Sequence, residues 1–95
     1  DEDKFAADTV SLISKEREFI CTNFQRMNIK YWESDANYIF FMHKKGLKEE
    51  LLNRGILIRD CSNYKNLTDG YYRIAIKSHK DNVKLIDALA DIDIN

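Results

Sequence analysis

Apolar side chains recur at helical spacing along the first third of the chain. Steps of seven separate the members of two series within residues 3–27, namely Phe5, Leu12 and Phe19, and Ile13, Ile20 and Met27. Residues seven apart lie on one face of a helix, so the pattern predicts an amphipathic helix of roughly 35 Å that Asn28 closes. The polar positions off this stripe, which we expect to face solvent, are Glu16, Arg17, Glu18, Gln25 and Arg26.

Short apolar segments follow, each bounded by polar or turn-forming residues. They predict strands over residues 29–33, 37–42, 56–58 and 71–77. The pair Ser34-Asp35 is typical of a turn between the first two of these strands. A strand with one solvated face would alternate apolar and polar residues, whereas the second strand is apolar on both faces. We therefore expect it to be central in the sheet and covered on both sides.

Two further helices are indicated by their boundary residues. The first spans residues 46–54, and Gly55 is placed to end it as a C-terminal cap. The second begins at Ser78, with Asp81 three residues later in a variant of the capping box. We expect residues 91–95 at its end to be frayed. The apolar stripe of this closing helix is expected to consist of Val83, Ile86, Leu89 and Ala90.

The order of the predicted elements, α-β-β-α-β-β-α, indicates a mixed α/β domain of the two-layer α+β kind. We expect a small, mostly antiparallel sheet of about four strands with three helices. The 95 residues are enough for a single small domain with a modest core. The chain opens Asp1-Glu2-Asp3 without an initiator Met, so we expect a fragment of a longer protein.

Composition narrows the class of partner. A net charge of −1 argues against a nucleic-acid-binding module, which normally carries a basic excess. No run approaches the ~18 apolar residues that a membrane helix needs, and no secretory signal is present. Cys21 and Cys61 stand forty residues apart, which favours two free thiols in a reducing cytosol. We therefore expect a cytoplasmic protein that binds neither nucleic acid nor membrane.

Two arginines are the main candidate binding residues. Arg59 ends one predicted strand, and Arg73 stands inside the next, fourteen positions later. A guanidinium in such a place requires an anionic partner because it does not lose its proton. Strand alternation places Arg73 on one face with Tyr71 and Ala75. In a purely structural alternative, Arg73 pairs with a nearby carboxylate, and Arg59 reaches water with Asp60 as its counter-ion.

Other side chains that could carry chemistry favour packing roles. Cys61 has no histidine near it in the sequence, so we expect a partly buried, unreactive thiol. His43 and His79 are single and lack ligand spacing, so no metal site is expected. Asn63 in a loop and Asn37 before a strand serve turns and packing at least as readily as they serve a ligand.

A resemblance to a known family is carried by residues 59–64 (RDCSNY), Leu67, residues 70–76 (GYYRIAI) and residues 35–41 (DANYIFF). These segments resemble the C-terminal small domain of fold-type-I, pyridoxal-phosphate-dependent class I/II aminotransferases. The branch they are most similar to contains threonine-phosphate decarboxylase and histidinol-phosphate aminotransferase. The resemblance extends over residues 5–89. It implies that residues 1–95 form a single small domain cut from a larger enzyme.

The resemblance implies substrate-binding roles for four residues. The arginine that matches Arg73 grips the α-carboxylate of the amino-acid substrate with a two-pronged hydrogen bond. Arg59 would approach the substrate phosphate, so that the two arginines hold both ends of a small phosphorylated amino acid. Asn63 and Asn37 would lie at the edge of the site. The sequence departs from the family at Lys65-Asn66, where Pro-Gly is often found.

The implied activity is that of a threonine-phosphate decarboxylase of the cobalamin-pathway type, with histidinol-phosphate or a related amino-acid aminotransferase as the alternative. Pyridoxal 5′-phosphate and its Schiff-base lysine would belong mainly to a large domain outside this chain. No catalytic or cofactor-binding residue is therefore expected within the 95 residues, which would be inactive alone. The full-length enzyme is expected to be a homodimer.

Two interpretations from other classes stay open at this point. A stand-alone α/β regulatory or ligand-binding module would need no missing domain and would lack catalysis. An RNA-binding α/β sheet would expose aromatic residues beside basic ones, and Tyr38, Phe40 and Phe41 supply the aromatics. The near-neutral charge and the missing glycine-rich strand motif count against the RNA interpretation.

Overall fold

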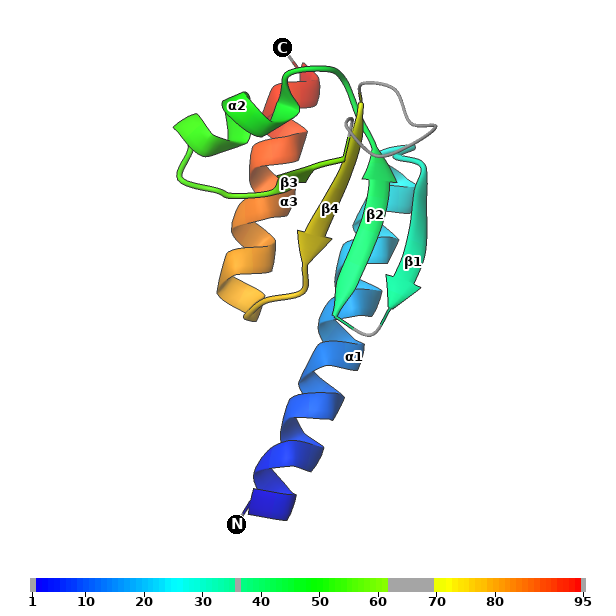
Figure 1. Ribbon diagram of the computed structural model, residues 1–95, viewed down its shortest axis with the longest axis vertical. Helices are drawn as coiled ribbons and strands as arrows, with labels where there is room; N and C mark the ends of the chain where they lie inside the picture. The colour runs from blue at the N-terminus through cyan, green and yellow to red at the C-terminus, as the bar shows by residue number, and fades with distance from the viewer. Residues whose placement is uncertain (1, 36, 62–69, 95) are drawn as a thin grey trace.

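Three helices and four strands make up the computed structural model, which describes residues 2–35, 37–61 and 70–94. Side-chain positions are given for residues 11–33, 37–61 and 70–93. In chain order the elements are α1 (Glu2–Arg26), β1 (Tyr31–Asp35), β2 (Tyr38–Met42), α2 (Leu47–Asn53), β3 (Arg59–Asp60), β4 (Tyr71–Ala75) and α3 (His79–Ile94), as Figure 1 shows.

The strands form one antiparallel sheet in the order β1-β2-β4-β3. The helices α1 and α3 lie on one side of this sheet, and α2 lies beyond the β3 edge (Figure 1). The N-terminal half of α1 extends past the sheet (Figure 1). The expected class, three helices on a small antiparallel sheet of four strands, is confirmed.

The predicted end of α1 at Asn28 is confirmed. Asn28 adopts a left-handed conformation with φ of 59°. Its N–H donates to the Gln25 carbonyl at 3.2 Å, and the Ile29 N–H donates to the Phe24 carbonyl at 2.9 Å. This pair of bonds is the Schellman arrangement, which satisfies the last carbonyls of a helix. The cap also explains why β1 begins at Tyr31 rather than at the expected residue 29, since the Ile29 N–H is already used.

Gly55 ends α2 in the same way. Its φ is 78°, and its N–H donates to the Leu52 carbonyl at 2.9 Å. The Ile56 N–H donates to the Leu51 carbonyl at 2.8 Å. Because Ile56 completes the cap, the expected strand over residues 56–58 is wrong. Backbone pairing with β4 starts only at Arg59, and β3 has two residues.

The first turn of α3 matches the sequence, but the end of the helix does not. The Asp81 N–H donates to Ser78 Oγ at 3.3 Å, which confirms Ser78 as the N-terminal cap. The expected fraying is wrong for residues 91–94, because α3 continues to Ile94, and residue 95 lies outside the described residues. Ile92 is buried, and Asp93 Oδ1 lies 3.0 Å from His43 Nε2. Both sides of the last turn therefore contact the rest of the domain.

The hydrophobic core fills the space between the sheet and the helices. Ile20 and Phe24 from α1 are completely buried, whereas Leu12, which was expected on the apolar stripe, is 47 % exposed. Leu12 belongs to the N-terminal half of α1, which extends past the sheet (Figure 1), so this part of the stripe is not packed on the core. The main core residues are Ile20, Phe24, Ile39, Phe41, Leu47, Leu51, Tyr72, Ile74, Leu85, Ile86, Leu89 and Ile92.

The prediction that Glu16 faces solvent is wrong, because only 5 % of its accessible surface is exposed. Its Oε1 accepts a hydrogen bond from Asn82 Nδ2 at 3.0 Å, and His79 Nδ1 lies 3.0 Å from its Oε2. Asn82 Nδ2 also donates to the Lys77 carbonyl at 2.9 Å. A buried carboxylate requires such partners. The cluster joins α1 to the start of α3 and to the end of β4, which spacing along one helix does not reveal.

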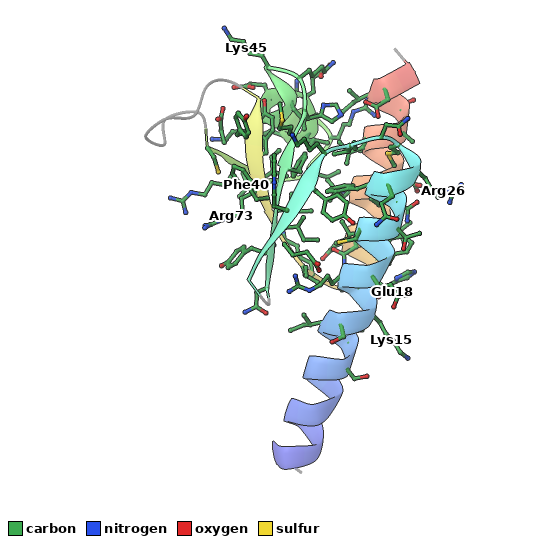
Figure 2. All side chains as sticks on the ribbon, turned by 90° about the vertical axis from the view of Figure 1, so that its right-hand side faces the viewer. Lys15, Glu18, Arg26, Phe40, Lys45 and Arg73 are labelled. Atoms are coloured by element: carbon green, nitrogen blue, oxygen red, sulfur yellow. The ribbon has the colours of Figure 1, made fainter. Side chains whose placement is uncertain are left out.

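The two faces of β2 also differ from the expectation. The strand is central, as predicted, but only Ile39 and Phe41 on the helix side are buried. Tyr38 and Phe40 on the other side are half-buried, and Met42 is 36 % exposed. Asp35 pairs with Tyr38 after a bulge in β1, so Ser34-Asp35 belongs to the strand rather than to the turn. Among the described residues, no helix covers the second face of the sheet (Figure 2).

Candidate functional site

A single row of paired residues crosses the open face of the sheet. Trp32 pairs with Phe40, Phe40 pairs with Arg73, and Arg73 pairs with Arg59. Residues directly opposite one another in a sheet point to the same face, with Cβ atoms about 5 Å apart in each pair. The two candidate arginines are therefore direct neighbours, although fourteen positions separate them in the sequence.

The alternation expected for β4 is confirmed. Tyr72 and Ile74 are buried against the helices, while Tyr71, Arg73 and Ala75 on the other face are half-buried. Figure 2 shows the Arg73 side chain projecting from the sheet on the side away from α1. The guanidinium thus lies on the face that no described helix covers.

Around the arginines lies an open groove of about 420 Å³, which we call the cationic groove. Four of its lining residues are cationic, and none of its lining residues is acidic. Side chains from β2, α2, β3 and β4 meet in it, so the sheet and a helix both contribute. The residues that line the cationic groove are Tyr38, Lys48, Leu57, Ile58, Arg59, Arg73, Ala75 and Lys77.

The structural alternative is supported only in part, because Arg59 is exposed to water as that alternative expects, whereas neither arginine has the expected carboxylate partner among the described residues. Asp60, the expected counter-ion of Arg59, pairs with Tyr72 and therefore belongs to the opposite face of the sheet. Within residues 11–33, 37–61 and 70–93, no carboxylate forms an ion pair with Arg59 or Arg73. Like charges directly opposite in a sheet are destabilising, and an anion held between them would remove that cost. The electrostatics therefore favour an anionic ligand.

The guanidinium of Arg73 contacts the aromatic ring of Tyr38. The Arg73 Cζ lies 4.5 Å from the centroid of the Tyr38 ring. Phe40, directly opposite Arg73, instead packs against Tyr71 at 5.6 Å and Trp32 at 5.4 Å between ring centroids. The open face thus carries an aromatic cluster next to the cationic groove.

Tyr72 fixes the helix that supplies Lys48 to the groove. Its hydroxyl donates to the Lys44 carbonyl at 2.7 Å and accepts from the Leu47 N–H at 3.3 Å, just before and at the start of α2. Burial raises the pKa of the Tyr72 hydroxyl above its ordinary value. The side chain stays neutral and can both donate and accept. One buried residue of β4 therefore positions α2 against the strand that carries Arg73.

Gly70 fixes the start of β4. Its φ is 99°, and its carbonyl accepts a hydrogen bond from the His43 N–H at 2.8 Å. A Cβ at this position would lie 2.7 Å from the His43 carbonyl oxygen, which is backbone and has little room to move. The close approach of β4 to the end of β2 therefore requires glycine.

The other two candidate residues are Asn63 and Asn37. Asn63 lies outside the described residues, so its predicted role stays a prediction. Asn37 is exposed beside Tyr38, and its carbonyl accepts a hydrogen bond from the Ile76 N–H at 2.8 Å. Its side chain is not among the residues that line the cationic groove. Its ligand role also stays a prediction.

The thiols and histidines lie away from the groove lining. Cys61 is completely buried, and burial raises the pKa of the Cys21 thiol, with the Glu33 carboxylate adding to this effect. His79 and His43 are engaged with Glu16 and Asp93. The described residues hold no group of three or more His, Cys, Asp or Glu side chains able to bind a metal ion. Among these residues, no helix combines the length and the hydropathy that a membrane crossing requires.

Three groove residues with polar or charged side chains were missed from the sequence: Tyr38, Lys48 and Lys77. The alternation in β2 contained a signal for Tyr38, because it falls on the same face as Phe40. Lys48 and Lys77 had no such signal. They resemble solvated lysines until the fold brings α2 and the end of β4 to Arg59.

The chain belongs to the class I and II aminotransferase family, whose model matches residues 1–89. A histidinol-phosphate aminotransferase from Methanocella arvoryzae is 31 % identical over an alignment of 88 residues, and the match covers 88 % of this chain and 24 % of that protein. The threonine-phosphate decarboxylase of Salmonella typhimurium is 40 % identical over 60 residues, covering 60 % of this chain and 16 % of that protein.

A solved structure agrees with these relatives. The histidinol-phosphate aminotransferase from Clostridium acetobutylicum superposes with a TM-score of 0.89 at 28 % identity, over 100 % of this chain and 30 % of that chain. The chain thus spans about a quarter of the length of the first curated relative, at 24 %. The resemblance to class I/II aminotransferases is confirmed, and it favours the enzyme interpretation over the stand-alone and RNA-binding ones.

The cationic groove does not by itself match a pyridoxal-phosphate site. A protonated pyridine nitrogen needs an acidic partner, and no acidic residue lines the groove. Of the two lysines that line the groove, Lys48 is half-buried and Lys77 is exposed. Neither has the desolvated surroundings that make a lysine nucleophilic. The groove suits the anionic ends of a substrate better than the cofactor.

Proposed function

We propose that this chain is the substrate-binding small domain of a pyridoxal-phosphate-dependent enzyme that acts on a phosphorylated amino acid. The observation that carries the proposal is the direct pairing of Arg59 with Arg73 in a groove whose lining residues include four cations and no carboxylate. Two fixed guanidinium groups side by side suit a ligand with two anionic ends. The family and the names of its relatives supply the class of reaction.

Arg73 is assigned to the α-carboxylate. It is half-buried at the centre of the open face, between Phe40 and Arg59, where its surroundings limit the directions of its N–H groups. A planar fork meets a planar carboxylate through two parallel hydrogen bonds, which fixes both distance and orientation. Such orientation matters for a carboxylate that is either retained or lost in the reaction.

Arg59 is assigned to the phosphate, with Lys48 as a second cation beside it. Arg59 is more exposed than Arg73, and Lys48 approaches the same groove from α2. A phosphate monoester carries about two negative charges at neutral pH. The carboxylate adds a third, so a groove with four cationic side chains balances such a ligand.

The remainder of the enzyme is proposed to cover the open face. The relatives are about four times longer than the part that this chain matches, since it covers 24 % of the first. Trp32 is 40 % exposed, and it forms with Phe40 and Tyr71 an apolar surface beside the groove. We propose that a large domain packs on this surface and closes the groove.

Pyridoxal phosphate, when bound by that large domain, supplies the electron sink that stabilises negative charge on Cα of the substrate. The contribution of this chain is to hold the substrate. Arg73 fixes the carboxylate and thereby decides whether the bond to the carboxylate or the bond to hydrogen is aligned for cleavage. Decarboxylation of threonine phosphate is the first choice. The alternative is amino-group transfer from a related amino acid or from histidinol phosphate, which has no carboxylate for Arg73 to hold.

The test is an assay of the complete protein with threonine phosphate. We expect release of carbon dioxide, measured in parallel with amino-group transfer to 2-oxoglutarate. Transfer without carbon dioxide release would replace the first choice with the aminotransferase alternative.

The matched variant is Arg73→Lys, which keeps the charge but loses the planar fork. We expect it to lower kcat/KM by about 100-fold, because a single rotatable ammonium does not reproduce two parallel hydrogen bonds. The thermal midpoint should change little, since Arg73 lies on the open face. An unchanged kcat/KM would contradict the proposed role of Arg73.

A further inference from the structure

We infer that Tyr38 is a positioning residue that orients the Arg73 guanidinium for the substrate carboxylate. The inference rests on the proposed function, and it gives a role to Tyr38, which lies in the segment DANYIFF that carries the resemblance but has so far been assigned no part in substrate binding. Its basis is the contact between the Tyr38 ring and the Arg73 Cζ, which lies 4.5 Å from the ring centroid.

The contact places the Arg73 Cζ over the Tyr38 ring, and this position is compatible with hydrogen bonds from the N–H edge of the guanidinium. A guanidinium is flat, and its N–H donors lie in its plane, whereas an aromatic ring contacts it through its face. A guanidinium that lies flat on the Tyr38 ring can therefore donate to a carboxylate with a different part of the same group. The two interactions are compatible, and the first restricts the plane in which the second forms.

Electrostatics give the ring a second effect. Arg59 is directly opposite Arg73, so repulsion pushes the two guanidinium groups apart when no ligand is bound. The face of an aromatic ring carries partial negative charge and attracts a cation within about 6 Å of its centroid. Tyr38 counteracts the repulsion without an acidic side chain, which would compete with the substrate for the same donors.

The strand register makes the arrangement specific to Tyr38. Ala75 is directly opposite Tyr38, and Arg73 is the diagonal neighbour on the same face. The small Ala75 side chain leaves space for the ring and the guanidinium to overlap. Phe40, opposite Arg73, has its ring packed against Tyr71 and Trp32. It therefore serves as a control position on the same strand and face.

The experiment compares four variants of the complete, cofactor-loaded protein: Tyr38→Phe, Tyr38→Leu, Phe40→Leu and Arg73→Ala. We measure kcat/KM for the phosphorylated amino-acid substrate, together with the inhibition constant of the phosphorylated amine that lacks the carboxylate. We expect Tyr38→Leu to lower kcat/KM about tenfold and Tyr38→Phe to stay within about threefold of the original protein, because the ring face is retained. The inhibition constant of the carboxylate-free amine should not change in either Tyr38 variant.

A double variant separates positioning from general damage. In the Arg73→Ala background, Tyr38→Leu should cause no further loss, because the group that it orients is gone. Phe40→Leu should reduce kcat/KM less than Tyr38→Leu. A tenfold loss that persists without Arg73, or that Tyr38→Phe shares, would overturn the inference.

Failure of the inference is distinguishable from failure of the proposed function. If Arg73→Ala lowers kcat/KM strongly while Tyr38→Leu does not, the arginine binds substrate without help from the ring and the inference is wrong. If Arg73→Ala itself leaves kcat/KM unchanged, the proposed function is wrong and the inference falls with it.

Discussion

The two faces of β4 are built for different purposes. On the covered face, Tyr72 and Ile74 are buried among helix residues, and the Tyr72 hydroxyl has partners on both sides. On the open face, Arg73 stands beside another arginine with no ion pair to a carboxylate of the described residues. One face of the strand satisfies its own polar groups. The other face carries two neighbouring cations that pair with no carboxylate of the described residues.

This difference separates stability from binding in a single strand. Changes on the covered face should reduce the free energy of unfolding and affect binding only indirectly. Changes on the open face should affect binding while leaving the fold intact or slightly more stable. The predictions below test that separation, starting with the largest expected effect.

The largest effect is expected from a cavity in the covered layer. Phe24→Ala removes a completely buried ring that contacts Phe41 at 5.2 Å and Tyr31 at 5.9 Å between centroids. We expect a loss of about 3–5 kcal/mol in the free energy of unfolding, measured by urea denaturation. The matched control is Trp32→Ala on the open face, which should cost about 1 kcal/mol or less. Equal losses would show that the open face carries as much of the core as the covered one.

Gly70→Ala tests the junction that both faces share. The added Cβ would meet the His43 carbonyl oxygen at 2.7 Å, and φ of 99° is unfavourable for alanine. We expect about 2 kcal/mol of destabilisation, seen as a lower thermal midpoint. The comparison variant is Gly46→Ala, which also has positive φ but has no atom within 4 Å of the added Cβ. A greater loss at Gly46 would contradict the steric explanation.

Glu16→Ala tests the polar cluster behind the sheet. The variant removes the acceptor that Asn82 Nδ2 reaches at 3.0 Å and leaves buried polar groups with fewer partners. We expect a loss of about 1–2 kcal/mol in the free energy of unfolding, measured by thermal denaturation. Glu18→Ala, at an exposed position of the same helix, should change it by less than about 0.5 kcal/mol. Identical midpoints for the two variants would mean that the buried cluster contributes nothing.

The smallest effect has the opposite sign. Arg59→Gln removes one of two like charges that are directly opposite on neighbouring strands. Without a ligand, we expect the variant to be more stable by a few tenths of a kcal/mol, because the repulsion is relieved. Differential scanning calorimetry at low ionic strength would detect this, since salt screens exposed charges. A loss of stability would indicate that Arg59 has a structural partner instead.

The order of elements and the capping residues were predictable because they depend on local chemistry. Asn28 and Gly55 have the left-handed conformations that end helices, and Ser78 caps the next one. The face of Arg73 was also predictable, since alternation along a strand requires no knowledge of neighbouring elements.

What the sequence did not show depends on contacts between distant segments. Glu16 looked like a solvated helix residue because its partners, His79 and Asn82, lie 63 and 66 positions away. Residues 56–58 looked like a strand because they are apolar, but their backbone follows a helix cap before it reaches β4. The direct pairing of Arg59 with Arg73 depends on strand register, which the intervening loop length does not specify.

The central claim is that Arg73 and Arg59 hold opposite ends of one ligand. Its most direct test is a titration of the complete, cofactor-loaded protein, followed through the visible absorbance of the cofactor. Three ligands are compared: threonine phosphate, threonine without the phosphate, and the phosphorylated amine without the carboxylate. Each is titrated into the original protein, Arg73→Ala and Arg59→Ala.

We predict that Arg73→Ala weakens the binding of threonine phosphate by about 100-fold. The affinity for the carboxylate-free amine should stay within about threefold of that of the original protein. Arg59→Ala should weaken the binding of threonine phosphate and of the carboxylate-free amine but leave the affinity for threonine almost unchanged. Equal weakening of all three ligands by both variants, or no weakening by either, would contradict the claim that each arginine recognises its own end of the substrate.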